Sequence, residues 1–419
     1  MPVTFVIIGA GSRGMTYSQY AKHYPDDMQI VGVADCRTLR AQRAQKTFNI
    51  PDSHVFSDWR DVAAVEKFAD AAIIATQDKD HKEPAVALAK KGYHILLEKP
   101  MATTEEDCLE IVSCCKENSV LLAVCHVLKY TPQAMKIKEL IDCGAIGQVV
   151  NIQHLEPIGF WHYGHSYVRG NWRREDESSF CLMTKSCHDL DLICYWMGRS
   201  KCVKVSSFGQ LTHFTKEHKP EGAANRCLDC KVEKECPYSA VKLYLNQVKQ
   251  GNTHWPVDVV VDIPDIESVT EALRTGPYGR CVYDCDNDVV THQVVNLQFD
   301  QGQTVSFTMV AFTESVCRRE VKVHGTMGEL TCKFGGPVYQ YDFRTRKMIT
   351  HSPELSNAPA GLSGHGGADY RTIRSFLKAL QTGDSSLLST GPEESLRSHL
   401  LVFAAEKARK ENRVISLSL

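Results

Sequence analysis

The chain contains 419 residues, 43% of them hydrophobic and 23% charged, with a formal net charge of −2. This length exceeds one typical hydrophobic core and predicts two domains of a globular enzyme. The charge gives no electrostatic case for nucleic acid or an anionic membrane surface as a partner, and no apolar run approaches the roughly 20 residues of a membrane span.

The N-terminus leads directly into a strand pattern, without the basic segment and cleavage site of a signal peptide. The seventeen cysteines are odd in number and lie mostly in apolar contexts, as Cys114 and Cys125 do. Buried free thiols in a reducing compartment are the simplest interpretation, so we expect a cytoplasmic protein.

A glycine-rich loop follows the first predicted strand, residues 3–8, and precedes a predicted helix over residues 15–23. This is G-x-G-x-x-G in the required order of strand, turn and helix. The glycines permit the tight turn and let the backbone approach a pyrophosphate, whose charge faces the helix N-terminus. The sequence therefore predicts a dinucleotide-binding loop made of Gly9, Gly11, Ser12, Arg13 and Gly14.

A second predicted strand, residues 28–34, ends at Asp35, about 20 residues after the glycines. A carboxylate here accepts hydrogen bonds from a ribose 2′-hydroxyl and repels a 2′-phosphate, which favours NAD over NADP. Arg37 keeps NADP open, because a nearby arginine can accommodate that phosphate.

Strands and helices continue to alternate up to residue 125, which predicts a doubly wound parallel sheet, an α/β Rossmann domain over residues 1–125. The predicted strands are 71–75, 93–97 and 120–125, and the predicted helices are 39–48, 59–66, 83–91 and 103–118, the last opened by a capping box from Thr103 to Glu106. Thr76, Gln77 and His81 follow a strand end, so we expect them beside the cofactor; helix capping or a solvent-facing role is the alternative.

Glu98, Lys99 and Pro100 stand directly after the apolar run 93–97. Ligands bind beyond the carboxyl ends of strands in such sheets, and Pro100 holds Lys99 extended. Lys99 is therefore a candidate for proton transfer or charge stabilisation, and a plain surface lysine is the alternative.

These motifs together resemble the Gfo/Idh/MocA family, named for glucose–fructose oxidoreductase and inositol dehydrogenase. The resemblance rests on the glycine loop, on Ala75-Thr76 with His81, and on Glu98-Lys99-Pro100-Met-Ala. It implies an N-terminal domain that binds NAD(P), with Glu98 and Lys99 at the cofactor, a catalytic role for Lys99, and a sugar, cyclitol or related polyol as substrate. It extends through Gly144–Gly147 and Gly325–Gly328 to the last helix, nearly the full chain.

Residues 126–419 are expected to form an α+β domain with a large, mostly antiparallel open sheet. The predicted strands are 148–156, 289–299, 304–312, 319–324 and 329–334, with a hairpin turn at 300–303, and the predicted helices are 132–143, 364–380 and an amphipathic 395–410. An open sheet face suits a homo-oligomer, a dimer or tetramer, through the C-terminal sheet.

A polar and aromatic stretch at residues 160–173 has no clean periodicity. Aromatic faces beside hydrogen-bonding groups suit a sugar, so His165, Trp172 and Arg173 are candidate substrate residues; a structural loop is the alternative. The resembled family often has a Trp-Arg pair near this position. His365, flanked by glycines that permit close approach to a ligand, is a further candidate, with a plain linker as its alternative.

Residues 181–198 predict a helix that carries Thr184, Lys185, His188 and Asp191. Histidine changes charge near neutral pH, so this cluster is an acid–base candidate, and a satisfied core histidine is the alternative. The stretch resembles the family helix Asp-x-Gly-x-His-x-x-Asp, whose histidine works opposite the lysine. Thr184 stands where the family often has aspartate or tyrosine, and Lys185 is an added cation, either part of the proton relay or a ligand for a substrate carboxylate.

Residues 210–290 look like an insertion. Cys227, Cys230 and Cys236 have a spacing close to a structural zinc site, but only three sulfurs. His213, His218, Cys281 or Cys285 could supply a fourth ligand. A structural metal, simple packing and a transient disulfide all remain open.

The expected activity is hydride transfer between a nicotinamide and a secondary alcohol. His188 or Lys99 takes the hydroxyl proton, and the other stabilises the developing negative charge. One alternative is an NAD-dependent redox glycosidase that makes no net NADH. Another is a non-catalytic regulator that binds NAD.

Overall fold

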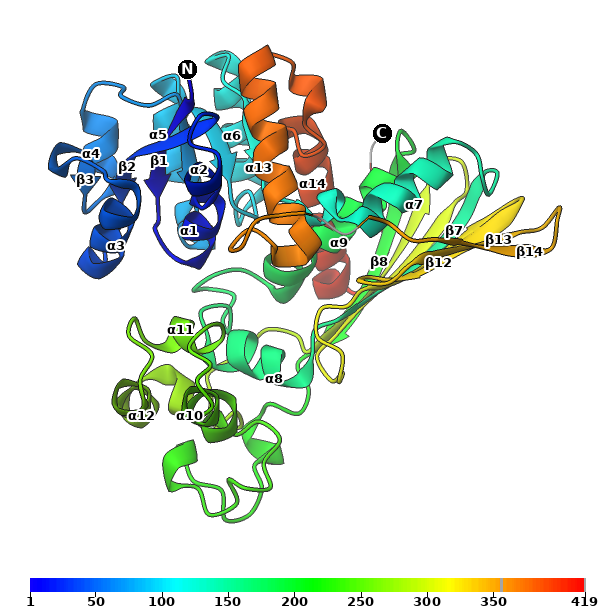
Figure 1. The fold of residues 1–419 in the computed structure, drawn as a ribbon. Coiled ribbons are helices and arrows are strands. Elements are labelled where there is room, and N and C mark those ends of the chain that lie inside the picture. The colour runs from blue at the N-terminus through cyan, green and yellow to red at the C-terminus, as the bar shows by residue number, and fades with distance from the viewer. Residues whose placement is uncertain (355–356, 418–419) are drawn as a thin grey trace.

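The computed structural model describes residues 1–354 and 357–417. Two sheets dominate the molecule, and the insertion forms a separate lobe (Figure 1). Among the described residues, no helix combines the length and the apolar character needed to cross a bilayer. The predicted fold class, a Rossmann domain followed by an α+β domain, is confirmed.

The N-terminal sheet has six parallel strands in the order β3-β2-β1-β4-β5-β6. The strands are β1 (Val3–Ile8), β2 (Met28–Ala34), β3 (Val55–Phe56), β4 (Ala71–Ile74), β5 (His94–Leu97) and β6 (Leu122–Val124). The order reverses between β1 and β4, which places the binding crevice of an open α/β sheet at their carboxyl ends. Phe5 and Ile7 pack on one face of β1, and Val6 and Ile8 on the other, so both faces are covered.

Helices cover both faces of this sheet (Figure 1). They are α1 (Ser12–Ser18), α2 (Tyr20–His23), α3 (Thr38–Phe48), α4 (Trp59–Ala64), α5 (Lys82–Lys90) and α6 (Glu105–Glu117). The single helix predicted for residues 15–23 is two helices that meet at Gln19. The capping box predicted at Thr103 was wrong by one residue, because Thr104 is the last extended residue and its hydroxyl accepts from the Asp107 N–H.

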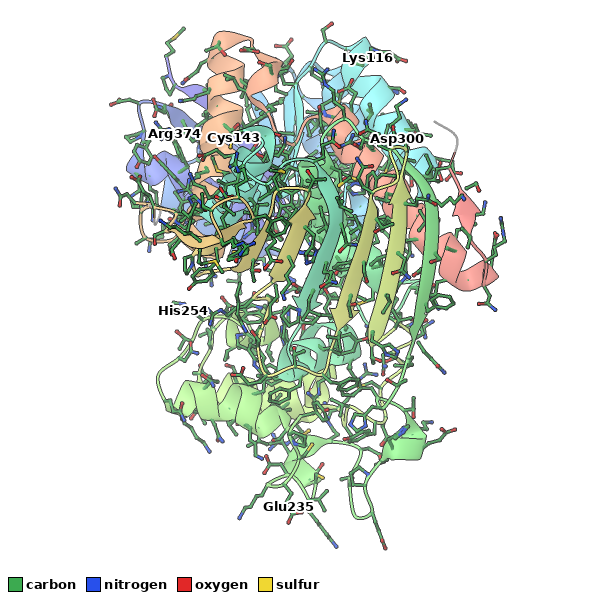
Figure 2. All side chains as sticks on the ribbon, turned by 90° about the vertical axis from the view of Figure 1, so that its right-hand side faces the viewer. Lys116, Cys143, Glu235, His254, Asp300 and Arg374 are labelled. Atoms are coloured by element: carbon green, nitrogen blue, oxygen red, sulfur yellow. The ribbon has the colours of Figure 1, made fainter. Side chains whose placement is uncertain are left out.

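The second sheet has nine strands in the order β14-β13-β12-β11-β7-β10-β9-β8-β15. The strands are β7 (Val149–Pro157), β8 (Cys202–Gln210), β9 (His292–Phe299), β10 (Thr304–Val310), β11 (Glu320–Gly325), β12 (Gly328–Lys333), β13 (Val338–Asp342), β14 (Lys347–His351) and β15 (Ile415–Ser416). All neighbours are antiparallel except β7 and β10. Figure 2 shows its broad face turned to the viewer, with Asp300 beyond the end of β9.

Four longer helices connect the two sheets. They are α7 (Pro132–Asp142), α9 (Cys181–Met197), α13 (Gly364–Thr382) and α14 (Pro392–Glu411). α13 returns to the parallel sheet, where Ile373 and Phe376 pack in the same apolar cluster as Phe5. α14 packs on α9 and β8 on one side and on α6 on the other, so it links both sheets. α13 is regular only after Gly367, because residues 365–367 have positive φ.

The insertion contains little regular structure. Its helices are α10 (Asn246–Lys249), α11 (Val257–Val260) and α12 (Ile266–Thr275), which occupy the lower lobe of Figure 1. It has a small apolar core of its own, around Tyr244, Val269 and Leu273. α8 (Phe160–Tyr163) and the following turn η4 (Gly164–Arg169) connect this lobe to the second sheet.

Candidate active site

Two histidines fix the loop directly after Lys99. His81 Nδ1 lies 2.7 Å from the Pro100 carbonyl oxygen. The Met101 N–H donates to His399 Nε2 at 2.8 Å, which brings α14 against the same loop. The Lys99–Pro100 peptide is cis. Lys99 is therefore held at a fixed place at the carboxyl end of β5.

The Lys99 side chain is half-buried and reaches α9. Its Nζ donates to the Thr184 carbonyl oxygen at 2.7 Å. Thr184 and His188 are four residues apart in this helix, so they lie on one face, one turn apart. The ammonium and the imidazole, which come from distant parts of the chain, therefore share one region of α9.

His188 is buried, with 7% of its surface exposed, and its Nδ1 has no hydrogen-bond partner among the described residues. Burial lowers the pKa of His188 well below its usual value, and the nearby charge of Lys99 lowers it further. The imidazole is therefore neutral near pH 7, which is the form that accepts a proton.

Two further histidines continue from His188. The rings of His188 and His126 meet edge to face with centroids 5.6 Å apart, and those of His126 and His399 are 5.2 Å apart. Burial lowers the pKa of His126, and that of His399 to about 3. Sequence reasoning missed both, although His126 follows the strand next to β5 and so lies at the same sheet edge as Lys99.

Asp191, a predicted substrate residue, is paired with Lys129. It is fully buried, and its Oδ1 lies 3.0 Å from Lys129 Nζ. Burial raises the pKa of Asp191, and the charge of Lys129 acts in the opposite direction. His126 Nδ1 lies 3.9 Å from the second carboxylate oxygen. Asp191 thus stands behind the histidine row, paired with an internal cation.

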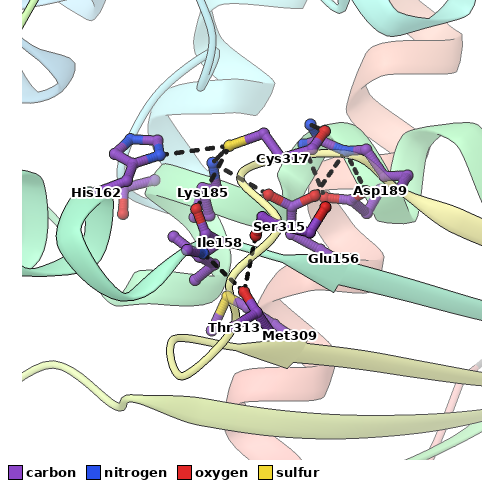
Figure 3. A network of polar contacts seen from close by, with 12 residues as sticks. Glu156, Ile158, His162, Lys185, Asp189, Met309, Thr313, Ser315 and Cys317 are labelled. Carbon is purple, nitrogen blue, oxygen red and sulfur yellow. Dashed lines mark hydrogen bonds and ion pairs between the residues drawn. The ribbon is translucent and has the colours of Figure 1, made fainter. Parts of the chain in front are cut away.

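Lys185, a predicted catalytic residue, lies in a buried polar network with Glu156 and Cys317 (Figure 3). Its Nζ lies 3.1 Å from Glu156 Oε1 and 2.9 Å from Cys317 Sγ. Burial lowers the pKa of Lys185, but Cys317 and Glu156 raise it more. The ammonium is therefore occupied inside the fold. Thr184, also buried, directs its hydroxyl to the Cys181 carbonyl of its own helix at 3.4 Å.

Arg319 completes this network. Its Nε lies 2.8 Å from Glu156 and 3.0 Å from Asp189, and Asp189 also contacts His154 Nε2 at 2.8 Å. Burial raises the pKa of Asp189, but Arg319 and His154 hold it below its usual range. Two carboxylates and two cations therefore balance one another beneath α9.

Asp78 is a third residue that sequence reasoning missed. It is buried directly after Gln77, and it accepts hydrogen bonds from Trp172 Nε1 at 3.0 Å and Ser178 Oγ at 3.1 Å. Burial raises the pKa of Asp78, whereas the charges of His81 and Lys99 lower it. Its place after the end of β4 was the available signal. Trp172 is thereby brought to the same strand-end loop.

Two other predicted substrate residues are held by the insertion. Arg173 Nε lies 3.0 Å from Asp286, and its Nη1 lies 2.7 Å from Glu177. His165 is buried, and its Nδ1 lies 2.8 Å from the Tyr244 hydroxyl. Neither side chain is brought to Lys99.

The glycine loop, the Lys99 loop and the start of α13 meet through Arg13. Its Nε lies 2.7 Å from Glu98 Oε1, and its Nη2 lies 2.8 Å from Asp369 Oδ1. His365 Nδ1 lies 3.2 Å from the same Asp369 oxygen. The predicted residues Arg13, Glu98 and His365 are therefore brought together, with Asp369 between Arg13 and His365.

The glycine loop fits a dinucleotide. Gly9 has φ +91°, and a Cβ added there would lie 2.6 Å from the Ala75 carbonyl oxygen. A Cβ on Gly14 would lie 2.0 Å from the Gly9 oxygen. No side chain caps the first turn of α1, so its backbone N–H groups remain available for a phosphate.

Asp35 stands at the position expected to bind the ribose, and its carboxylate also fixes the glycine loop. Its Oδ2 accepts from the Ala10 N–H at 2.7 Å, and its Oδ1 from the Arg37 N–H at 2.8 Å. Ser12 and Gln77 are exposed beside the crevice, and Thr76 Oγ1 donates to the Asp80 carbonyl at 3.0 Å.

The insertion touches the helix that follows Asp35. Arg43 Nη2 donates to the Asp262 carbonyl at 3.1 Å. Arg40 Nε and Arg37 Nη1 lie 3.6 Å and 3.8 Å from the Asp262 carboxylate. The lobe therefore reaches the ribose side of the parallel sheet.

Residues 3–126 match the family of oxidoreductases with an NAD-binding Rossmann fold, and residues 138–417 match the C-terminal α/β domain of the same family. The chain belongs to the Gfo/Idh/MocA oxidoreductase family. Its NAD-binding Rossmann domain and its C-terminal domain are both present.

Family members differ in what they do. The YteT protein of Bacillus subtilis (strain 168) is 25% identical over 342 residues, 78% of this chain and 75% of its own length. A 2,7-anhydro-N-acetylneuraminate hydratase of Escherichia coli (strain K12) is 29% identical over 36% of this chain and 40% of its own. For several other curated relatives the chain spans about half of their length. A levoglucosan dehydrogenase solved with NADH and L-sorbose has the same fold, with a TM-score of 0.73, 17% identity and full coverage of both chains.

Proposed function

We propose that this protein transfers a hydride between a nicotinamide and a secondary alcohol of a sugar, cyclitol or related polyol. The observation that carries the proposal is the pairing of Lys99 with His188. A half-buried ammonium bonded to the Thr184 carbonyl stands one helical turn from a buried, neutral imidazole, beyond the carboxyl end of a Rossmann strand. When bound, NAD supplies the hydride acceptor.

His188 serves as the base in this proposal. As carbon loses hydride, the substrate hydroxyl loses its proton, and a neutral imidazole can take it. The pKa of His188 is low because of burial and of Lys99, so the proton is held weakly there. The His126 ring is a neighbouring buried imidazole that contacts His188 edge to face, and among the described residues no hydrogen bond joins the two rings.

Lys99 serves as the fixed cation. Its Nζ, oriented by Thr184, stabilises the negative charge that develops on the substrate oxygen. Asp78 lies near enough for the charge of Lys99 to lower its pKa, which keeps a buried carboxyl group beside the ammonium. Trp172 and Ser178 fix that carboxyl group in place.

The aromatic stretch lines a cavity of the insertion lobe that neither Lys99 nor His188 lines, so this cavity bears on binding of a carbohydrate and not on the reaction at Lys99. Phe160 and Trp161 line a cavity of about 530 Å³ together with Trp255 of the insertion. Hydrogen-bonding side chains line it too, among them Lys242, Gln247 and Asn252. Aromatic faces with a few polar groups suit a ring that has apolar faces and a polar edge.

NAD is the expected cofactor rather than NADP. Asp35 presents a carboxylate at the end of β2, where it repels a 2′-phosphate. The arginines that follow it, Arg37 and Arg40, face the Asp262 carboxylate of the insertion, which offsets their charge.

A redox-neutral reaction is the second candidate. The 2,7-anhydro-N-acetylneuraminate hydratase of Escherichia coli is a relative, and the contacts of Asp262 with α3 place the insertion across the ribose side, where it would slow exchange of the cofactor. A retained cofactor suits transient oxidation followed by return of the hydride, as in a redox glycosidase. This reaction makes no net NADH.

One experiment separates the two candidates. The protein is first screened by thermal shift against NAD, NADP, sugars, cyclitols and chromogenic glycosides, because ligands of the folded state raise its apparent stability. Hits are then assayed for NADH absorbance and for release of the aryl group. Net NADH with a polyol supports the dehydrogenase, and aryl release without NADH supports the redox-neutral reaction. A protein that binds NAD but does neither would contradict both.

We also propose a homo-oligomer through the open sheet face. Residues on β8 and β10 alternate between buried and exposed, and Phe208 is 61% exposed. Light scattering should show more than one chain per particle, and Phe208→Glu should reduce it. A monomeric wild-type protein would contradict the proposal.

A further inference from the structure

The cysteines of the insertion surround a cavity. Cys227, Cys230, Cys236 and Cys281 all line a space of about 270 Å³. The two chain segments that carry them lie side by side, since Arg226 and Arg280 form a β-bridge and the Cys281 N–H donates to the Asn225 carbonyl at 2.9 Å. None of these cysteines is in a disulfide.

Arg169 lines the same cavity and is 1% exposed. Its Nε donates to the Arg280 carbonyl and its Nη2 to the Tyr238 carbonyl, each at 2.8 Å, and Nη2 lies 3.5 Å from Cys227 Sγ. Its Nη1 is buried without a hydrogen-bond partner in the part of the chain that the structure describes. A buried guanidinium N–H without a partner indicates that an acceptor group belongs beside it.

No described carboxylate balances this guanidinium. Glu221, Glu233 and Glu235 line the cavity, but Arg169 forms no ion pair with any carboxylate of residues 1–354 and 357–417. A buried, unbalanced positive charge is costly, which favours an anionic group in the cavity.

The four cysteines do not converge on one point as the ligands of a single metal ion would. The described residues include no group of three or more His, Cys, Asp or Glu that could hold one metal ion. Zinc draws four sulfurs to about 2.3 Å from one point. Here four cysteines surround a space large enough for several atoms.

We propose that Cys227, Cys230, Cys236 and Cys281 bind an iron–sulfur cluster, with Arg169 as its buried counter-charge. Each thiol loses its proton on binding, and the resulting thiolates give the cluster a net negative charge beside the guanidinium. No electron transfer to substrate is part of the proposal, which is independent of the reaction at Lys99.

The insertion has a physical need for such a link. Its own apolar core is small and its helices are short, and small cores are commonly supplemented by metals or disulfides. The cluster would join the Cys227–Cys236 segment to Cys281 at the other end of the insertion, and through Arg169 to η4. Glu235 marks this outer end of the lobe in Figure 2.

The full-length protein, purified without oxygen and supplied with iron and sulfide, tests the proposal. We expect about two or about four iron atoms per chain with an equal amount of acid-labile sulfide, and a visible absorbance that dithionite bleaches. Iron below about one atom per chain, or zinc in place of iron, would overturn it.

Variants assign the ligands. Cys230→Ser should lose the iron and the visible absorbance, whereas Cys202→Ser, on β8 outside the cavity, should keep both. NAD-induced thermal stabilisation, which reports the separate parallel-sheet domain, shows that each variant is folded. Equal iron in both cysteine variants would refute the ligand set.

Arg169→Gln tests the counter-charge by a property that a structural role alone would not change. Removing a positive charge beside the cluster should shift its reduction potential in the negative direction, while Arg169→Lys should shift it less. An unchanged potential in Arg169→Gln would remove Arg169 from the proposal.

Discussion

Lys99 has its position because of residues from several distant segments. His81 holds the next carbonyl, His399 of α14 holds Met101, and Thr184 of α9 binds the ammonium itself. A lysine side chain has high conformational entropy, so this fixation is what makes it suitable for stabilising charge at one point.

His188 gives a prediction about pH. Because burial and Lys99 lower its pKa, the imidazole stays neutral below the usual histidine range, and turnover should remain level from about pH 8 to below about pH 6.5. His188→Gln should lower kcat by about 10²–10⁴-fold. The pH–rate profile measures both effects, with His23→Gln on exposed α2 as the control. Wild-type turnover that falls as the pH passes below about 6.5, the usual pKa of histidine, would contradict this role.

The sequence predicts the residues at strand ends better than their partners. Lys99, Asp35 and the glycine loop follow predicted strands, so the topology alone placed them at one edge. The direction of Lys185 and Asp191 depends on Glu156, Cys317 and Lys129, which are distant in sequence. Helical spacing predicts which side chains share a helix, but it does not predict which residues of other segments pack against them.

At the scale of the element, α6 offers a test of where the helix begins. Thr104→Ala removes the hydroxyl that accepts from the Asp107 N–H and should lower the free energy of unfolding by about 1 kcal/mol. Thr103→Ala, one residue before the cap, should change it by less than about 0.5 kcal/mol. Urea denaturation of the two variants measures these losses. A larger loss in Thr103→Ala than in Thr104→Ala would show that Thr103 is the cap.

The network beneath α9 gives a larger effect. Arg319→Met leaves Glu156 and Asp189 without their shared cation and should cost about 3–5 kcal/mol of unfolding free energy. Arg344→Met is the control, since Arg344 pairs with Asp342 while 62% of its side chain is exposed, and it should cost much less than Arg319→Met. Similar losses in urea denaturation would contradict the assignment of Arg319.

Sequence patterns identified the central strands of the second sheet and missed its edge. β8, β13 and β14 were not predicted. β14 is exposed along almost its whole length, so it has no apolar alternation to recognise. β15 is too short to give a periodic signal.

At the scale of the whole molecule, stability should depend on buried histidines. Burial lowers the pKa of a set of them: His126, His162, His165, His188 and His399. In the unfolded chain they titrate near pH 6.5, so below that value the unfolded state binds more protons than the folded state. The free energy of unfolding should therefore fall as pH falls below about 6.5, by about 1.4 kcal/mol per pH unit for each such histidine.

Urea denaturation at several pH values measures this slope. His399→Gln should reduce it by about one proton, because Gln can still accept from the Met101 N–H but does not titrate. His23→Gln should leave it unchanged. A stability that is constant or rises as the solution becomes more acidic would contradict the burial of neutral imidazoles.

The two sheets depend on each other for the site. Lys99 comes from the parallel sheet, His188 from the second domain, and α14 packs against both. Because each domain supplies one motif, the sequence predicts Lys99 and His188 separately. It does not predict that His399 of α14 packs against the Lys99 loop.

Transfer of isotope label from the C–H of a polyol to NAD tests the central claim most directly. The wild-type protein and Lys116→Ala, an exposed lysine of α6, should transfer label at similar rates. Lys99→Ala should transfer it about 10²–10⁴-fold more slowly while NAD still raises its thermal stability. Label transfer by Lys99→Ala at the wild-type rate would contradict the account.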